Sequence, residues 1–180
     1  MENIKFALVE KKYNRLQNFL DLWLLYMREI GDERNDDKIL GHANKIIEIQ
    51  EKKHAENKVY NIELCTQNEN IIGFCFYCIA EIKHQNDTEY GLIIKPLVDY
   101  SDYGYILEYY VNPEYRLQGY GKIMFDHIKE IFEKRKIKKI VLTPNTKAEY
   151  FWEKIGFKNS GRVDPTNNLP IFIKNLTGPK

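Results

Sequence analysis

Two glycines separated by a single residue, Gly119 and Gly121, lie between a segment with strand character and a segment with helix character. The preceding residues 105–111 are rich in aromatic and branched side chains, which suit a pleated strand. Pro113 should end that strand, because proline has no amide hydrogen for a ladder. The following residues 120–132 place apolar side chains at helical spacing. The sequence therefore predicts a strand, a glycine turn and an amphipathic helix.

This turn has the chemistry of an anion site. The first amides of a helix have no partner inside the helix and lie at the positive end of its dipole. Gly119 and Gly121 have no side chain to block a ligand, and either can adopt a positive φ. A phosphate group suits such a turn, and Arg116 and Lys122 could add charge. The alternative is close packing without a ligand, since a single G-x-G before a helix is common.

Two sequence blocks carry a family resemblance. Residues 111–116 fit the pattern V-x-P-x-Y-R, and residues 116–121 fit Q/R-x-x-G-x-G/A. A later block fits N-x-x-A-x-x-F-Y-E-K-x-G-F through Asn145, Ala148, Phe151, Glu153, Lys154, Gly156 and Phe157. In order and spacing the blocks resemble the GNAT N-acetyltransferase superfamily. The resemblance covers residues 105–158, and the first hundred residues agree only in the order of their elements.

The resemblance implies acetyl-coenzyme A as the acetyl donor and cosubstrate. Its diphosphate would lie on the backbone amides of Leu117, Gln118, Gly119, Tyr120, Gly121 and Lys122, with Arg116 nearby. Its pantetheine arm would pair like an added strand with the backbone from Tyr109 to Val111, and Asn145 matches the asparagine that contacts this arm in relatives. The amide of Val111 would polarise the thioester carbonyl.

Acetylation of an amine also requires a base, because a lysine-like amine has a pKa of roughly 10 in water. Glu108 is the only acid in the predicted central strand, and many relatives have an acid at or next to this position. Alternation places its side chain on the face of Ile106 and Tyr110. We therefore expect Glu108 to be the general base. The alternative is an acid that bonds to a neighbouring strand or binds the charge of the substrate without moving protons.

The second block departs from the family pattern at one position. The pattern often has a tyrosine that protonates the leaving thiolate, whereas this chain has Trp152, and an indole is no proton donor at neutral pH. Tyr150 would project from another side of the helix. Three explanations remain open: solvent protonates the thiolate, a tyrosine such as Tyr109 or Tyr110 does so, or catalysis is weak.

Composition bounds the class of protein. The 180 residues, 43% hydrophobic and 29% charged, predict a single soluble domain over residues 1–180. A net charge of +1 argues against a nucleic-acid surface, and the basic run at 134–139 suits a solvated helix end. No stretch is long and apolar enough to predict a membrane span. The pair Cys75 and Cys78 would face opposite sides of a strand, so we expect no metal site and a reduced, cytoplasmic protein.

The remaining elements predict an α/β (α+β) fold. Strands are expected at residues 4–9, 59–67, 71–82, 139–143, 157–162 and 169–176, and helices at 16–30, 39–50 and 146–155. Strand 71–82 is apolar on both faces and should lie inside the sheet. Segment 83–103 is either a substrate lid or an extra strand. The resemblance implies a mixed, mostly antiparallel twisted sheet of six or seven strands with about four helices, splayed beside the central strand.

The acidic connector at residues 32–37 has two interpretations. Asp36 or Asp37 could cap the second helix, or the whole connector could attract a cationic substrate. With Asp99 and Asp102, the second interpretation favours a small cationic amine acceptor such as a polyamine or an aminoglycoside. The expected reaction is direct acetyl transfer from acetyl-CoA to that primary amine, with a homodimer possible by family precedent. The alternatives are a protein N-terminus or lysine as acceptor, or a non-catalytic acyl-CoA-binding module.

Overall fold

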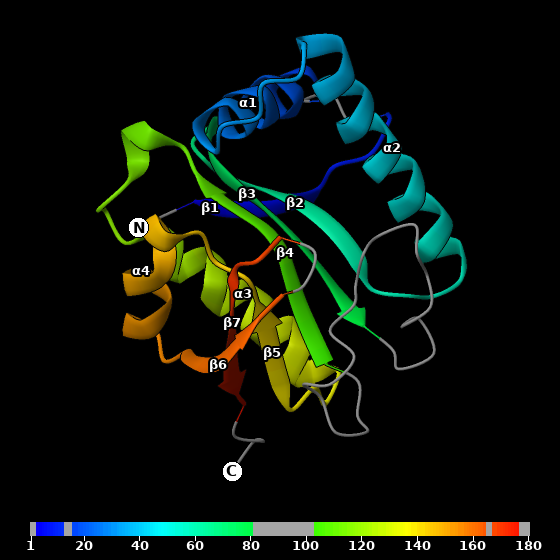
Figure 1. Cartoon of the computed structure of the whole chain (residues 1–180). Coiled ribbons are helices and arrows are strands. Elements are labelled where there is room, and N and C mark those ends of the chain that lie inside the picture. The colour runs from blue at the N-terminus through cyan, green and yellow to red at the C-terminus, as the bar shows by residue number, and fades with distance from the viewer. Residues whose placement is uncertain (1–2, 13–15, 81–102, 165–166, 177–180) are drawn as a thin grey trace. The chain divides into compact units, whose positions relative to one another are not determined.

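The computed structural model describes residues 3–12, 16–80, 103–164 and 167–176 (Figure 1). The segment expected to be a lid or an extra strand lies outside these residues up to position 102, as do Asp99 and Asp102. The strands are β1 (Ile4–Leu8), β2 (Tyr60–Gln67), β3 (Asn70–Ala80), β4 (Tyr103–Val111), β5 (Lys139–Leu142), β6 (Lys158–Val163) and β7 (Pro170–Asn175). The helices are α1 (Leu16–Glu29), α2 (Asp36–Ala55), α3 (Tyr120–Lys134) and α4 (Glu149–Lys154), with short 3-10 turns η2 (Pro113–Tyr115) and η3 (Thr146–Ala148).

The strands form one mixed sheet of seven, in the order β1-β2-β3-β4-β5-β7-β6. β1 pairs with β2 antiparallel, β4 with β5 parallel, and β7 with both β5 and β6 antiparallel. The predicted mixed sheet and its four helices are confirmed. Strand β3 is interior, as its two apolar faces predicted.

The chain divides into two compact units. The first comprises Met1–Tyr77 and Glu108–Met124, and the second comprises Cys78–Leu107 and Phe125–Lys180. Strands β3 and β4 and helix α3 each contribute residues to both units. The prediction of a single domain over residues 1–180 stays a prediction.

In the first unit, α1 packs on β3 through an aromatic core. Phe19 and Trp23 of α1 each lie 5.5 Å from the ring of Phe74 in β3, and all three side chains are almost fully buried. The connection between β2 and β3 turns through Asn68 and Glu69, whose φ angles of 47° and 71° give the twist that a two-residue hairpin needs.

The end of α1 and the start of α2 are each set by a particular residue. Gly31 follows α1 with a φ of 88°, a left-handed backbone that glycine adopts without strain, so the helix ends there. Helix α2 begins earlier than its apolar pattern indicated, and its cap is Asn35, whose side-chain oxygen accepts from the amide of Lys38 at 3.0 Å. Asp36 and Asp37 lie in the first turn, so the prediction that one of them is the cap was wrong, although their charge still suits that end of the helix.

In the second unit, α4 packs through Trp152, which is 4% exposed and lies 6.2 Å from the ring of Phe125 and 5.2 Å from that of Phe157. Gly156 ends α4 with a φ of 93°, and the Nζ of Lys174 donates to the carbonyl of Ile155 at 2.7 Å. The described helices include none with the length and apolar character needed to cross a bilayer.

Candidate functional site

The predicted strand, glycine turn and helix form in this order. β4 ends at Val111, Asn112 caps η2, and Pro113 occupies its first position. The amide of Asn112 donates to the carbonyl of Ile72 in β3 at 2.9 Å. Successive amides along a strand point to opposite edges, so the amide of Val111 points away from β3. That edge is where the predicted thioester contact would have to form.

The loop after η2 has the backbone of an anion cradle. Leu117 and Gly119 have φ angles of 62° and 89°, and the side chain of Leu117 is fully exposed. The amides of residues 117–121 donate to no acceptor within the described part of the chain, whereas the amide of Lys122 donates to the carbonyl of Gly119 at 3.1 Å. Five adjacent donors at the start of α3 therefore fit a phosphate group.

Three side chains fix this loop in place. The Tyr109 hydroxyl donates to the carbonyl of Gly121, and the Tyr120 hydroxyl donates to the side-chain oxygen of Gln67 in β2. The side-chain Nε2 of Gln118 donates to the carbonyl of Glu114 at 3.0 Å. The cradle is thus held from β4, from β2 and from its own preceding turn.

Arg116 has a more specific environment than the sequence indicated. Its Nη1 and Nη2 donate to the two carboxylate oxygens of Glu29 at 2.8 and 2.7 Å, and its Nε donates to the carbonyl of Val111 at 2.9 Å. The guanidinium also lies 5.2 Å from the ring centre of Tyr110. Each guanidinium nitrogen has a protein partner, so this arginine braces the loop against the end of α1.

Glu108 lies on the same face of β4 as Tyr110, as strand alternation predicted, and that face is turned toward α1. Its Oε2 accepts a hydrogen bond from the hydroxyl of Tyr26. Burial raises the pKa of Glu108 to about 7, and the hydrogen bond from Tyr26 acts in the opposite direction. A carboxyl group with a pKa near neutrality can exchange a proton at physiological pH, which is what a general base requires.

Tyr110 shares that face of β4, and its hydroxyl donates to Oε2 of Glu29 at 2.8 Å. Its ring centre lies 5.1 Å from that of Tyr26. Tyr109 points to the opposite face, where it braces α3. Burial and the neighbouring Glu29 raise the pKa of Tyr110, which makes this phenol a weaker acid. Trp152, at the family's tyrosine position, is a core residue of the second unit.

Tyr26 and Glu29 are site residues that the sequence does not mark. Both lie in α1, whose sequence pattern indicates only an amphipathic helix. Tyr26 stands three positions after Trp23, on the buried face, and a buried phenol needs a hydrogen-bond acceptor. This requirement could have linked Tyr26 to Glu108, because an acid at the facing position of β4 is a suitable acceptor for a buried phenol.

Asn145 belongs to the second unit, where its side-chain oxygen accepts from the amide of Ala148 at 3.0 Å and caps η3. Its contact with the pantetheine arm stays a prediction from the motif. The parallel register of β4 with β5 consists of Gly104 opposite Ile140 and Tyr105 opposite Val141. The splay of the sheet at this strand likewise stays a prediction.

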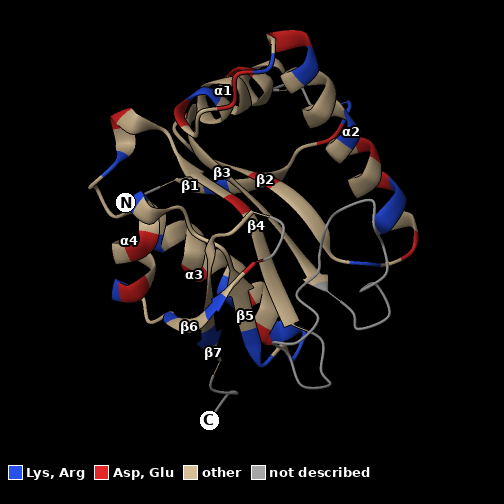
Figure 2. Cartoon of the chain, in the orientation of Figure 1, with Lys and Arg blue, Asp and Glu red and all other residues tan. Residues whose placement is uncertain are grey.

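Two of the four acids in the connector between α1 and α2 are paired with arginines. Arg34 pairs with Asp32 and lowers the pKa of that carboxyl to about 2, and Arg28 pairs with Asp36. Figure 2 shows acidic and basic segments side by side along α1, α2 and their connection. The connector therefore has less free negative charge than its sequence suggests.

The three cysteines are free and buried, and burial raises the pKa of Cys65 to about 12, so this thiol stays protonated. In the described ranges, no group of three or more His, Cys, Asp or Glu side chains is arranged to hold a metal ion.

The Acetyltransferase (GNAT) family model matches residues 16–157. This match covers most of the chain, which therefore belongs to the GNAT acetyltransferase family. It is an acetyl-CoA-dependent acetyltransferase, as the two sequence blocks predicted. No curated protein matches the sequence.

Solved acetyltransferases share the fold. The PaiA N-acetyltransferase of Thermoplasma acidophilum, solved in complex with coenzyme A, has a TM-score of 0.67 at 15% identity, with 97% of this chain and 99% of that chain covered. An acetyltransferase of Streptococcus agalactiae has a TM-score of 0.68 at 16% identity, with 98% and 100% covered. At these identities the likeness concerns the fold.

Proposed function

We propose that this protein transfers the acetyl group of acetyl-CoA directly to the primary amine of a small cationic acceptor, with Glu108 as the general base. The observation that carries the proposal is the half-buried Glu108 carboxyl, whose pKa burial raises to about 7, on the strand that leads directly into the amide-rich loop. A base and an anion cradle on consecutive segments suit direct transfer in a ternary complex.

The loop supports the cosubstrate assignment. The free amides of residues 117–121 would hold the diphosphate, with Lys122 adding positive charge and Arg116 bracing the loop. The backbone of Tyr109 to Val111 would pair with the pantetheine arm, with Asn145 as a further contact. The amide of Val111 would donate to the thioester oxygen as negative charge develops there. Acetyl-CoA supplies the activated acetyl group.

Glu108 would accept one proton from the acceptor's ammonium group. The freed nitrogen forms the new bond to the acetyl carbon as the carbon–sulfur bond breaks, the nitrogen then loses its second proton to solvent, and the thiolate takes a proton. Tyr110 is directed toward Glu29 and has a raised pKa, so the environment of this phenol favours solvent as the source of that proton.

A cationic acceptor is supported by the surroundings of Glu108. Its hydrogen-bond partner is a phenol, and none of the described cations lowers its pKa. The acidic connector at residues 32–37 gives weaker support for a cationic acceptor, because Asp32 and Asp36 are already paired with arginines.

Release of free thiol from acetyl-CoA, measured with a panel of polyamines, aminoglycosides and lysine peptides, tests the proposal. We expect release with at least one small polyamine or aminoglycoside, and a Glu108→Gln variant that loses the acid limb of the pH–rate profile. Turnover confined to peptides would transfer the assignment to protein acetylation. Binding of acetyl-CoA without turnover on any amine would overturn the proposal.

A further inference from the structure

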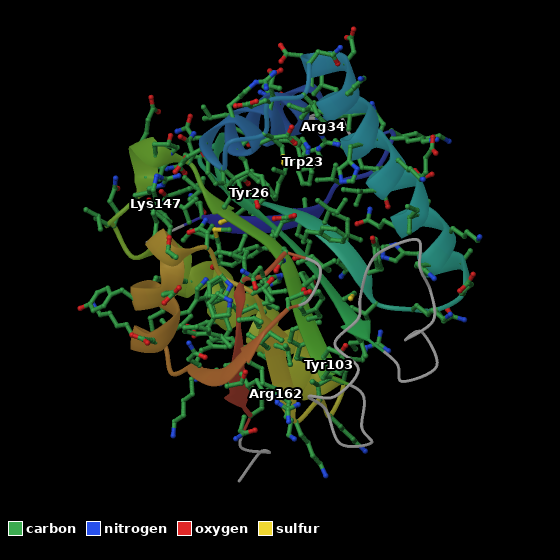
Figure 3. The ribbon with its side chains drawn as sticks, in the orientation of Figure 1. Trp23, Tyr26, Arg34, Tyr103, Lys147 and Arg162 are labelled. Carbon is green, nitrogen blue, oxygen red and sulfur yellow. The ribbon has the colours of Figure 1, made fainter. Side chains whose placement is uncertain are left out.

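The ring of Tyr26 is buried and packed against three other aromatic rings. Its ring contacts Trp23 at 5.9 Å, Phe74 at 5.5 Å and Tyr110 at 5.1 Å between centres, and the residue is 9% exposed. In Figure 3, Tyr26 and Trp23 extend from α1 toward the strands of the first unit. A ring packed by three others cannot swing, so its hydroxyl has a fixed direction. That direction leads to Oε2 of Glu108.

The two oxygens of Glu108 are therefore not equivalent. Oε2 accepts from Tyr26, whereas Oε1 accepts from no donor in the described ranges of the chain. A carboxylate has acceptor sites on both oxygens, and a buried one needs them filled by protein, water or ligand. Oε1 is thus the oxygen left to receive a donor from outside the protein.

The other ionisable groups around Tyr26 and Glu108 do not take over the hydrogen bond that Tyr26 donates to the carboxyl group. On α1, Glu29 is engaged by Arg116 and Tyr110, so this carboxylate and this guanidinium pair with each other. On α2, His42 stacks 6.2 Å from Trp23, and burial lowers the pKa of this histidine, which favours its neutral form. Tyr26 is then the group that sets the orientation of the carboxyl and part of its proton affinity.

We propose that Tyr26 is a positioning residue, which holds Oε2 of Glu108 so that Oε1 takes the proton of the acceptor amine. The inference rests on the proposed function of Glu108. In the step, a nitrogen–hydrogen bond of the ammonium breaks and an oxygen–hydrogen bond forms at Oε1. Tyr26 keeps its own proton throughout, because burial and the nearby carboxylate raise its pKa well above the ordinary value.

A Tyr26→Phe variant tests this role through the pH dependence of kcat. Loss of the hydrogen bond removes the influence that lowers the pKa of Glu108, so the acid limb should move to higher pH. The maximal kcat should fall about tenfold, as for a lost hydrogen bond to a charged group. The KM for acetyl-CoA should stay unchanged, since the hydrogen bond and ring contacts of Tyr26 are with α1, β3 and β4.

The matched control is Tyr77→Phe. The Tyr77 hydroxyl is also buried and donates to a carboxylate, Oε1 of Glu63, at 2.8 Å in the same unit. Both variants lose a buried phenol hydroxyl, and only the first should move the acid limb. A Tyr26→Phe enzyme whose limb and kcat match those of Tyr77→Phe would overturn the inference.

If Tyr26→Phe does not fold, 3-fluorotyrosine at position 26 is a second test, because it keeps both the ring and the hydroxyl. Its more acidic phenol donates more strongly, so the acid limb should move to lower pH, and an unmoved limb contradicts the proposal. Failure of the proposed role of Glu108 can be distinguished from failure of the proposed role of Tyr26. If Glu108→Gln keeps the wild-type profile, the base itself is wrong. If Glu108→Gln is inactive and neither change at position 26 moves the limb, only the role of Tyr26 is wrong.

Discussion

At the scale of single residues, Glu108 shows how a site can oppose the stability of its own fold. Burial disfavours the carboxylate, so the folded protein holds a proton that the unfolded chain releases at lower pH. The same burial brings its pKa close to the pH at which a base must act. Tyr26 limits this effect without cancelling it.

This opposition predicts a pH-dependent stability for Glu108→Gln. The pKa of Glu108 rises from an ordinary 4.5 to about 7 on folding, so its contribution to stability is retained below 4.5 and lost as pH rises to 7. The loss amounts to about 3 kcal/mol. The glutamine does not ionise and can still accept from Tyr26. Relative to wild type, the variant should therefore gain about this much between pH 4.5 and pH 8.

Urea unfolding of both proteins at the two pH values measures that gain. A difference in the free energy of unfolding that is the same at pH 4.5 and pH 8 would show that Glu108 is not destabilised by burial. Glu130→Gln is a suitable control, because Glu130 lies on α3 and pairs with exposed Lys134, which lowers the pKa of Glu130 instead.

At the scale of elements, the end of α1 is tied to the loop before α3. Glu29 accepts from both Arg116 and Tyr110, so one carboxylate joins α1, β4 and the loop. The pair is more than one-third exposed, which limits its contribution to stability to roughly 0–1 kcal/mol. Its effect should appear in the position of the loop.

Glu29→Gln separates two roles for Arg116. If Arg116 only braces the loop, removing its partner should loosen the cradle and raise the KM for acetyl-CoA about threefold, within the energy of one exposed ion pair. If Arg116 binds the diphosphate directly, the released guanidinium should lower that KM. We expect the rise, measured by steady-state kinetics at saturating amine. A lower KM would restore the direct contact that the motif suggested.

Alanine substitutions at two glycines test whether the loop at residues 117–121 binds the diphosphate. Gly119 and Gly161 have φ angles of 89° and 74°, so alanine at either position should cost about 1 kcal/mol in backbone strain. Only Gly119→Ala should also raise the KM for acetyl-CoA, because Gly161 lies in β6 of the second unit. Equal cofactor kinetics in the two variants would argue against a phosphate on this loop.

The elements also show what sequence could predict. Periodicity, Pro113 and the glycine stops located the strands and helices, because local sterics and burial decide these features. Strand alternation oriented Glu108 correctly. The partners of Arg116 and Glu108 could not be predicted, because Glu29 and Tyr26 meet them across 87 and 82 positions of sequence. Such contacts depend on how α1 crosses the sheet, which no local pattern specifies.

At the scale of the whole molecule, the predicted site residues fall unevenly between the two units. All except Asn145 lie in the first, within residues 108–122. The first unit alone thus contains the proposed base, its phenol and the cradle. Binding energy at the cradle should stabilise the folded chain, because the unfolded chain presents no such array of amides.

Coenzyme A should therefore raise the melting temperature of the full chain. At a concentration of about one hundred times its Kd, a ligand that binds only the folded state contributes about 2.7 kcal/mol, which corresponds to roughly 5–10 °C for a protein of this size. Pantetheine has no diphosphate, so at equal concentration it should give a much smaller shift. Gly119→Ala should reduce the coenzyme A shift, whereas Gly161→Ala should keep it. Equal shifts with pantetheine and coenzyme A would mean that the amides of residues 117–121 do not bind the diphosphate.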